Sequence, residues 1–141
     1  MTHLHGEFKI QGWDEKPVEE HPDGRKLTRA TVKRSFEGGL TGESSTEYLM
    51  AYAAGEKSAR FVGMERLTAE LEGETGHLTL ALTGVYDGKE AKADWEVVEG
   101  SGDGVFEGAS GKGSFHAPHG SAGEYKLDVK TLKTDPPLIL I

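Results

Sequence analysis

The chain contains no cysteine and has an excess of acidic residues over basic ones. The missing cysteines exclude disulfide bonds, zinc–thiolate sites and a thiol nucleophile. Only 16 lysine and arginine residues accompany 24 aspartate and glutamate residues, so the formal net charge is −8. Nucleic-acid backbones are bound by clusters of basic side chains, and this sequence has none that stands out. We therefore expect no nucleic-acid partner.

Long hydrophobic runs are also missing. The longest, LILI at the C-terminus, is far too short to span a bilayer. The first ten residues, MTHLHGEFKI, lack a charged segment followed by an apolar one, which is the pattern of a secretory signal. We expect no membrane association and a cytoplasmic location.

Glycine and period-two alternation are abundant in this chain. Glycine accounts for 20 of 141 residues, about twice its usual share. Segments such as 27–36 and 78–82 alternate apolar with polar residues, and glycine-containing turns separate them. This pattern predicts about eight antiparallel strands in one all-β domain spanning residues 1–141, with a core at 3–130 and a tail at 131–141. A meander of this size closes into a barrel because closure removes the unpaired strand edges.

Three segments are harder to interpret. Residues 14–26, DEKPVEEHPDGRK, contain two prolines and a DG pair, which predict a long polar loop. Residues 59–73 fit either a helix or a strand, and we favour a strand because Gly63 interrupts the helical pattern. The tail KTDPPLILI follows the last strand, and its apolar end needs cover from a barrel groove or from a second subunit.

The stretch EGSGDGVFEGASGKGSF, residues 99–115, resembles a phosphate-binding loop in its glycine content alone. Such loops need a helix behind them, and none is predicted here. Lys112 is followed by Gly113, whereas the nucleotide-binding loop requires serine or threonine at that position. We interpret the glycines as turn and bulge positions around a short strand, and we expect no cofactor.

Several stretches in order resemble a bacterial family, domain of unknown function 3224. They include GWDEKP, KLTRATVKRSFEGGLTGES, EYLMAY, FVGMERLTAELEGETG, ADWEVVEGSGDG, GKGSFHAPHG and EYKLDV, and together they cover about residues 3–130. The resemblance implies a small closed barrel of the allene oxide cyclase-like type and assigns no activity. One departure is Leu82, at a position where the family commonly carries histidine.

Two carboxylates are candidates for acid–base chemistry in the lumen of the barrel. Glu65 and Glu47 both lie mid-strand among apolar residues, where desolvation would raise a carboxyl pKa. Glu65 shares a face with Phe61, Leu67 and Leu71 and is the better lumen candidate. The alternative is that each faces solvent or pairs with an arginine on a neighbouring strand, namely Arg34, Arg60 or Arg66.

His116 and His119 form an H-x-x-H pair with Pro118 between them. A metal needs further ligands, and the proline makes this segment a turn, so we expect no metal site. We predict instead that the pair lies at the barrel rim, with His116 as a candidate acid–base group and His119 as a ligand contact.

Large side chains on inward faces are candidates for contacts with a ligand in the lumen. The residues are Tyr48, Met50, Tyr52, Trp95 and Tyr125, and the alternative for each is ordinary core packing. Our leading hypothesis is a barrel that binds an apolar or aromatic small molecule, with cofactor-free isomerisation, cyclisation or proton transfer as its chemistry. The rival is a non-catalytic module with a packed lumen that acts through a homo-oligomer interface. A lumen cavity of about 300 Å³ or more favours the first.

Overall fold

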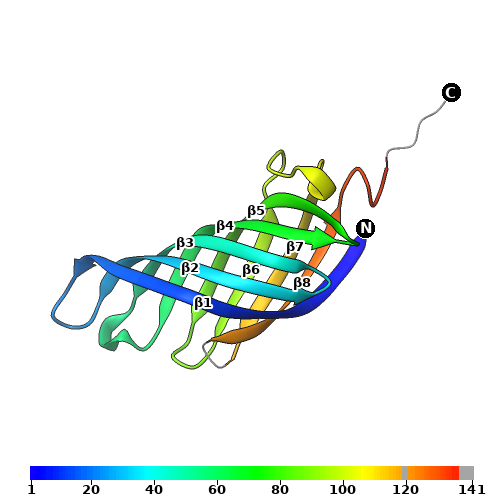
Figure 1. The fold of residues 1–141 in the computed structure, drawn as a ribbon. Coiled ribbons are helices and arrows are strands. Elements are labelled where there is room, and N and C mark those ends of the chain that lie inside the picture. Colours follow the sequence, from blue (N-terminus) through cyan, green and yellow to red (C-terminus); the bar gives the residue numbers. More distant parts are fainter. Residues whose placement is uncertain (119–120, 137–141) are drawn as a thin grey trace.

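The computed structural model describes residues 1–118 and 121–136 and forms one closed antiparallel barrel (Figure 1). Each strand pairs with its neighbour in sequence, and the last pairs with the first, which confirms the predicted eight-stranded barrel. The strands are β1 (Thr2–Glu20), β2 (Lys26–Gly38), β3 (Thr41–Tyr52), β4 (Ala59–Leu71), β5 (Glu74–Tyr86), β6 (Ala91–Val97), β7 (Ser110–Ala117) and β8 (Ala122–Lys130). Two short 3-10 turns, η1 (Ala54–Glu56) and η2 (Gly104–Phe106), lie in connections.

Alternation along the strands determines which side chains fill the barrel. In β2 the residues Thr28, Ala30, Val32, Arg34 and Phe36 are buried, and those between them are exposed or half-buried. In β4 the same period buries Phe61, Glu65, Leu67 and Leu71, so the strand predicted for this segment is confirmed. Burial of these apolar side chains drives closure, at about 25 cal/mol for each Å² removed from water.

Strand β1 is longer than the sequence predicts. The loop predicted for residues 14–26 is wrong over its first part, because residues 14–20 continue to pair with β2. Shifts in register at Ile10/Gly12 and at Pro17/Glu19 show that this strand carries two β-bulges. The first bulge absorbs one residue, so Trp13 and Glu15 pair with the inward-facing Val32 and Ala30. The charged, proline-containing half of β1 thus follows the barrel wall.

One end of the barrel is filled by the glycine-rich connection between β6 and β7. Within residues 98–109, Val105, Phe106 and Ala109 are buried, and η2 packs against β5. Gly104 has φ +57°, and a Cβ there would overlap the carbonyl oxygen of Thr75. The bulge predicted in the following strand is wrong, because β7 pairs with β6 and β8 without a shift in register. The glycines mainly allow close approach and positive φ values. We call residues 98–109 the plug.

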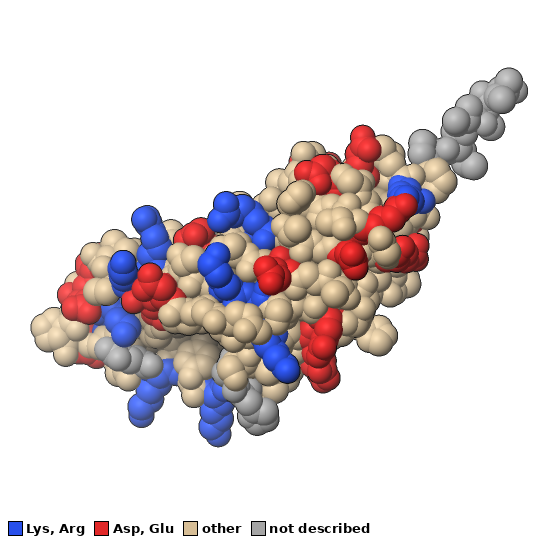
Figure 2. Space-filling view, in the orientation of Figure 1, with Lys and Arg blue, Asp and Glu red and all other residues tan. Residues whose placement is uncertain are grey.

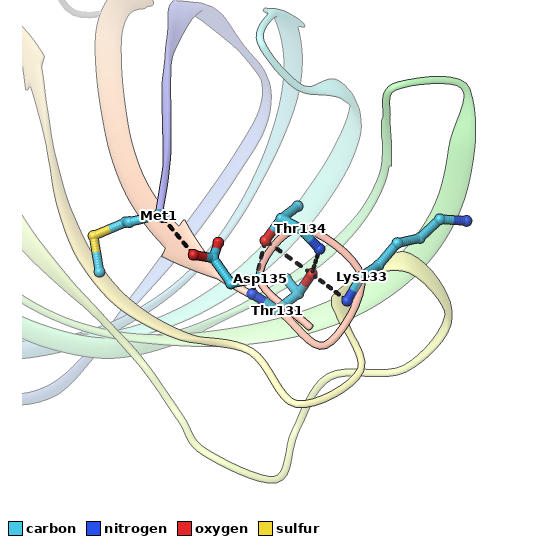
Figure 3. Close-up of polar contacts among 5 residues, drawn as sticks. All are labelled: Met1, Thr131, Lys133, Thr134 and Asp135. Carbon is cyan, nitrogen blue, oxygen red and sulfur yellow. Dashed lines mark hydrogen bonds and ion pairs between the residues drawn. The ribbon is translucent and has the colours of Figure 1, made fainter. Parts of the chain in front are cut away.

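The C-terminal segment after β8 lies at the same end as the plug, close to the N-terminus (Figure 3). The backbone N–H of Thr134 donates to the hydroxyl of Thr131 at 3.0 Å, and Asp135 accepts an ion-paired hydrogen bond from the Met1 amino group at 2.7 Å. The apolar LILI lies outside the described residues, so its cover and the homo-oligomer stay predictions. Within the described part of the chain, no helix is long and apolar enough to cross a membrane.

Candidate functional site

A cavity of about 350 Å³ occupies the end of the barrel opposite the plug. It lies beside the connections 21–25, 53–58 and 87–90, where the strands end on the left of Figure 1. Its wall is mainly aromatic, with Phe8, Trp13, Tyr48, Tyr52, Phe61, Tyr86 and Phe115. The charged residues that line it are Arg34 and Lys89. A cavity of this size and lining is typical of a site for a small, largely apolar molecule.

Small residues on the inward faces of the strands give the aromatic rings room. Gly84 in β5 is paired with Phe61 in β4, and a Cβ on Gly84 would overlap the Phe61 ring. Phe61 packs edge-to-face on Tyr48 with ring centroids 5.2 Å apart. Trp13, at the cavity mouth, also packs on Tyr48, with the two rings stacked and their centroids 6.2 Å apart. The cavity wall is thus a set of rings held against one another.

Arg34 and Tyr48 form what we call the floor of the cavity, and Arg34 belongs to a buried ion pair. Arg34 Nη1 is 3.4 Å from Glu65 Oε1 and donates to the Thr46 hydroxyl at 3.2 Å. Arg34 Nη2 donates to the hydroxyl of Tyr48. Arg34 is 3% exposed and Glu65 is fully buried. Neither charge could remain in so dry a place without the other.

Glu65 is fully engaged beneath the floor. Its Oε2 accepts a hydrogen bond from the Ser44 hydroxyl at 2.6 Å, and its Oε1 accepts one from Trp95 Nε1 at 3.1 Å. With Arg34 on Oε1 as well, both oxygens have donors. Glu65 does not line the cavity. Its geometry suits a group that fixes Arg34 rather than one that contacts a ligand.

Burial and charge act in opposite directions on the floor residues. Burial lowers the pKa of Arg34, but the Glu65 carboxylate and Tyr48 raise it by more, so the guanidinium stays charged. Burial raises the pKa of Tyr48, and although Arg34 opposes this effect, the pKa reaches about 12. Tyr48 therefore keeps its proton at neutral pH.

A second carboxylate stands at the mouth of the cavity. Glu15 accepts hydrogen bonds from Thr28 at 2.7 Å, from Tyr52 at 2.7 Å and from Trp13 Nε1 at 2.9 Å. Burial raises the pKa of Glu15, but these three donors and the positive charge of Lys26 outweigh it and lower the pKa. The mouth thus holds a negative charge, and both oxygens of this carboxylate already accept hydrogen bonds.

Three of the residues predicted to contact a ligand line the cavity, and two do not. Tyr48, Met50 and Tyr52 are in its wall. Trp95 lies beneath the floor against Glu65, and Tyr125 lies in the packed half of the barrel, where its hydroxyl donates to the Glu37 carbonyl at 2.8 Å. Strand alternation indicates the inward face correctly but does not indicate the depth at which the lumen opens.

The remaining predicted site residues lie away from the cavity. Glu47 is on the outer face of β3, where it accepts a hydrogen bond from Thr31 at 2.9 Å, because its neighbours Thr46 and Tyr48 point inward. His116 is on the outer face of β7 and lies 2.7 Å from Glu90. His119 lies outside the described residues. The described residues contain no group of three or more metal-ligating side chains.

Arg34 was expected only as one of three possible ion-pair partners of the two candidate carboxylates, and it does pair with Glu65, although it lies two strands away rather than on the neighbouring strand. Glu15 was not expected at the site. Arg34 stands in strict alternation with Ala30, Val32 and Phe36, so its inward position was readable from the sequence. An inward arginine in an apolar face is the signal that predicts a buried ion pair. Glu15 carried no such signal, because the bulge in β1 reverses the alternation just before it.

These features define an antiparallel barrel with one plugged end and one open aromatic cavity above a buried arginine–glutamate pair. The chain belongs to the family described as "Protein of unknown function (DUF3224)", whose model matches residues 4–129. It is similar to the crystal structure of a protein with unknown function from this family from Shewanella oneidensis MR-1. The two share 26% identity with a TM-score of 0.71, over 93% of this chain and 98% of that one. No curated protein matches the chain.

Proposed function

We propose that this protein binds a small, mostly apolar ring compound in the open half of its barrel. The observation that carries the proposal is the cavity of about 350 Å³ with its wall of seven aromatic side chains. Cavities of roughly 300–1,000 Å³ with such linings are the usual sites for small molecules. Aromatic rings recognise planar apolar ligands through buried area and through edge or face contacts.

A solidly packed lumen would have favoured the rival hypothesis of a purely structural module. The half of the barrel next to the plug is packed in this way, since Leu67, Leu78, Leu80 and Phe106 are almost completely buried there. Protein interiors of this kind leave few voids larger than a water molecule. The cavity is therefore confined to one half, which supports a ligand site rather than a uniformly filled barrel.

Catalysis by Glu65 remains a separate prediction within this function. A general base needs a lone pair within hydrogen-bond reach of the substrate proton. Both Glu65 oxygens already accept hydrogen bonds from side chains, and the residue lies beneath the cavity floor. Ligand binding accordingly has more support from the geometry than proton transfer.

Isothermal titration calorimetry with indane and 1-indanone tests the binding proposal, using a variant that fills the cavity. Ala117 is buried in its wall, so Ala117→Phe is expected to weaken binding by about tenfold or more. Ala51→Phe makes the same change on the outer face of β3 and is expected to bind as the unaltered chain does. If neither compound binds the unaltered chain, or if Ala117→Phe binds both equally well, the proposal is wrong.

A further inference from the structure

The cavity floor carries hydrogen-bond donors that have no acceptor. The Tyr48 hydroxyl accepts from Arg34, and its own proton finds no acceptor among the residues that the structure describes. Arg34 Nε is likewise buried without an acceptor. Tyr48 is 3% exposed, and both side chains line the cavity. The cavity floor thus has two N–H or O–H donors without an acceptor, one from β2 and one from β3.

The acceptors around these donors already accept hydrogen bonds from other side chains. Glu65 has donors on both oxygens, and the Thr46 hydroxyl accepts from Arg34. A ligand that expels water from the floor without offering an acceptor would leave a buried donor unsatisfied, at a cost of about 1–3 kcal/mol. The floor therefore favours a ligand group that accepts hydrogen bonds.

The charges around the cavity favour an uncharged ligand. The guanidinium of Arg34 is neutralised by Glu65, and the carboxylate of Glu15 stands at the mouth. Lys89, the other charged residue of the wall, is exposed to solvent, which screens it. On the face drawn in Figure 2, basic side chains predominate over the half of the barrel away from the C-terminus, with some acidic side chains among them, and solvent screens these exposed charges.

We infer that the ligand is an uncharged ring compound with one carbonyl group, whose oxygen accepts a hydrogen bond from the Tyr48 hydroxyl at the cavity floor. Arg34 polarises that hydroxyl by donating to its oxygen, and Glu65 holds Arg34 in place. Arg34 Nε is buried, so it can donate to the carbonyl oxygen of the ligand only after side chains at the floor shift. This inference rests on the proposed function and specifies its ligand class.

Tyr48 can act as this donor throughout the neutral pH range. Its pKa is raised to about 12, mainly by burial, so the hydroxyl proton is present well above neutrality. Trp13 stacks on the Tyr48 ring and Phe61 packs edge-to-face against it, so apolar neighbours surround the ring that carries this donor. One residue thus combines an apolar surface with a single directed donor.

Comparison of 1-indanone with indane tests this inference, because the two compounds differ by the carbonyl group. The unaltered chain is expected to bind 1-indanone at least about tenfold more tightly, as a hydrogen bond from a polarised donor predicts. Tyr48→Phe removes the hydroxyl and keeps the ring, so the preference for 1-indanone over indane is expected to vanish. Tyr125→Phe is the matched control, since this buried tyrosine lies outside the cavity and should leave the preference intact.

The outcomes separate this inference from the proposal on which it depends. Equal binding of indane and 1-indanone by the unaltered chain keeps the binding function and overturns the carbonyl inference. A preference that survives in Tyr48→Phe overturns the role of Tyr48. Tighter binding of indane-1-carboxylate than of 1-indanone overturns the inference that the ligand is uncharged.

An infrared measurement on the unaltered chain gives a result that does not depend on any variant folding. The carbonyl stretching frequency of bound 1-indanone is expected to fall below its value in hexane, because a hydrogen bond weakens the C=O bond. A bound carbonyl that absorbs at the hexane value contradicts the inference. No binding of either compound contradicts the proposed function itself.

Discussion

Arg34 and Glu65 are charged residues that the barrel buries almost completely, and each depends on the other. Their side chains come from β2 and β4 and meet across the intervening β3. Thr46, Tyr48, Ser44 and Trp95 provide the other hydrogen bonds of the pair. Such a pair contributes little net stability over well-packed apolar residues, but losing one partner is costly because the other charge is left buried.

Substitution of the pair should therefore be strongly non-additive. Glu65→Leu is expected to lower the free energy of unfolding by about 3–5 kcal/mol, since the Arg34 charge loses its partner. The double substitution Arg34→Met with Glu65→Leu should recover most of that loss. Urea unfolding followed by circular dichroism measures both values. A double variant as unstable as the sum of the two single variants would contradict this account.

At the same residue scale, the sequence could predict that Glu65 is buried but not what it does. Alternation in β4 places it among Phe61, Leu67 and Leu71. Its partners come from β2, β3 and β6, and contacts between distant strands depend on how strands tilt around the barrel, which alternation alone does not give. Alternation within β4 therefore left open whether Glu65 was a lone carboxylate in the lumen or the partner of an arginine.

At the scale of elements, regular strands were predictable and irregular ones were not. Period-two alternation in β2, β4 and β5 marks both the strand and its buried face. The second half of β1 has charged residues and a proline, and its two bulges break the alternation, so it resembles a loop in sequence. The plug posed a similar difficulty, because its buried residues follow no strand or helix period.

The plug packs closely against β5, so alanine substitutions at two glycines of the plug should differ in their effect on stability. Gly100 and Gly104 both have positive φ, but a Cβ has open space at Gly100 and overlaps the Thr75 carbonyl at Gly104. Gly100→Ala is expected to cost about 1 kcal/mol of unfolding free energy for the backbone conformation alone. Gly104→Ala should cost clearly more, and thermal unfolding of the two variants measures the difference. Equal losses of unfolding free energy in the two variants would mean that the plug backbone can move away from Thr75 at little cost.

At the scale of the whole molecule, the barrel has two dissimilar halves. The half with the plug also holds the N-terminus and the segment after β8, and its interior is filled with leucine and phenylalanine side chains (Figure 1). The other half encloses the cavity. Few packed contacts behind a strand make local opening easier. We therefore expect the strands to open more easily around the cavity than in the packed half.

Hydrogen exchange should reveal this asymmetry. Backbone amides of β4 and β5 near Leu67 and Leu78, in the packed half, are expected to exchange more slowly than those near Phe61 and Tyr86. Addition of 1-indanone should slow exchange around the cavity and leave the packed half nearly unchanged. Mass spectrometry of peptides from the two halves provides the measurement. Uniform protection along each strand would show that the barrel opens as one unit.

The two tryptophans stand at opposite sides of the cavity floor, and this gives the protein two independent optical reporters. Trp13 is 47% exposed at the mouth and stacks on Tyr48, whereas Trp95 is 2% exposed and hydrogen-bonded to Glu65. A soluble quencher therefore reaches the emission of Trp13 and not that of Trp95. Fluorescence of Trp13 will follow occupancy of the cavity, whereas fluorescence of Trp95, which touches the cavity wall through Phe115, will respond mainly to unfolding of the barrel.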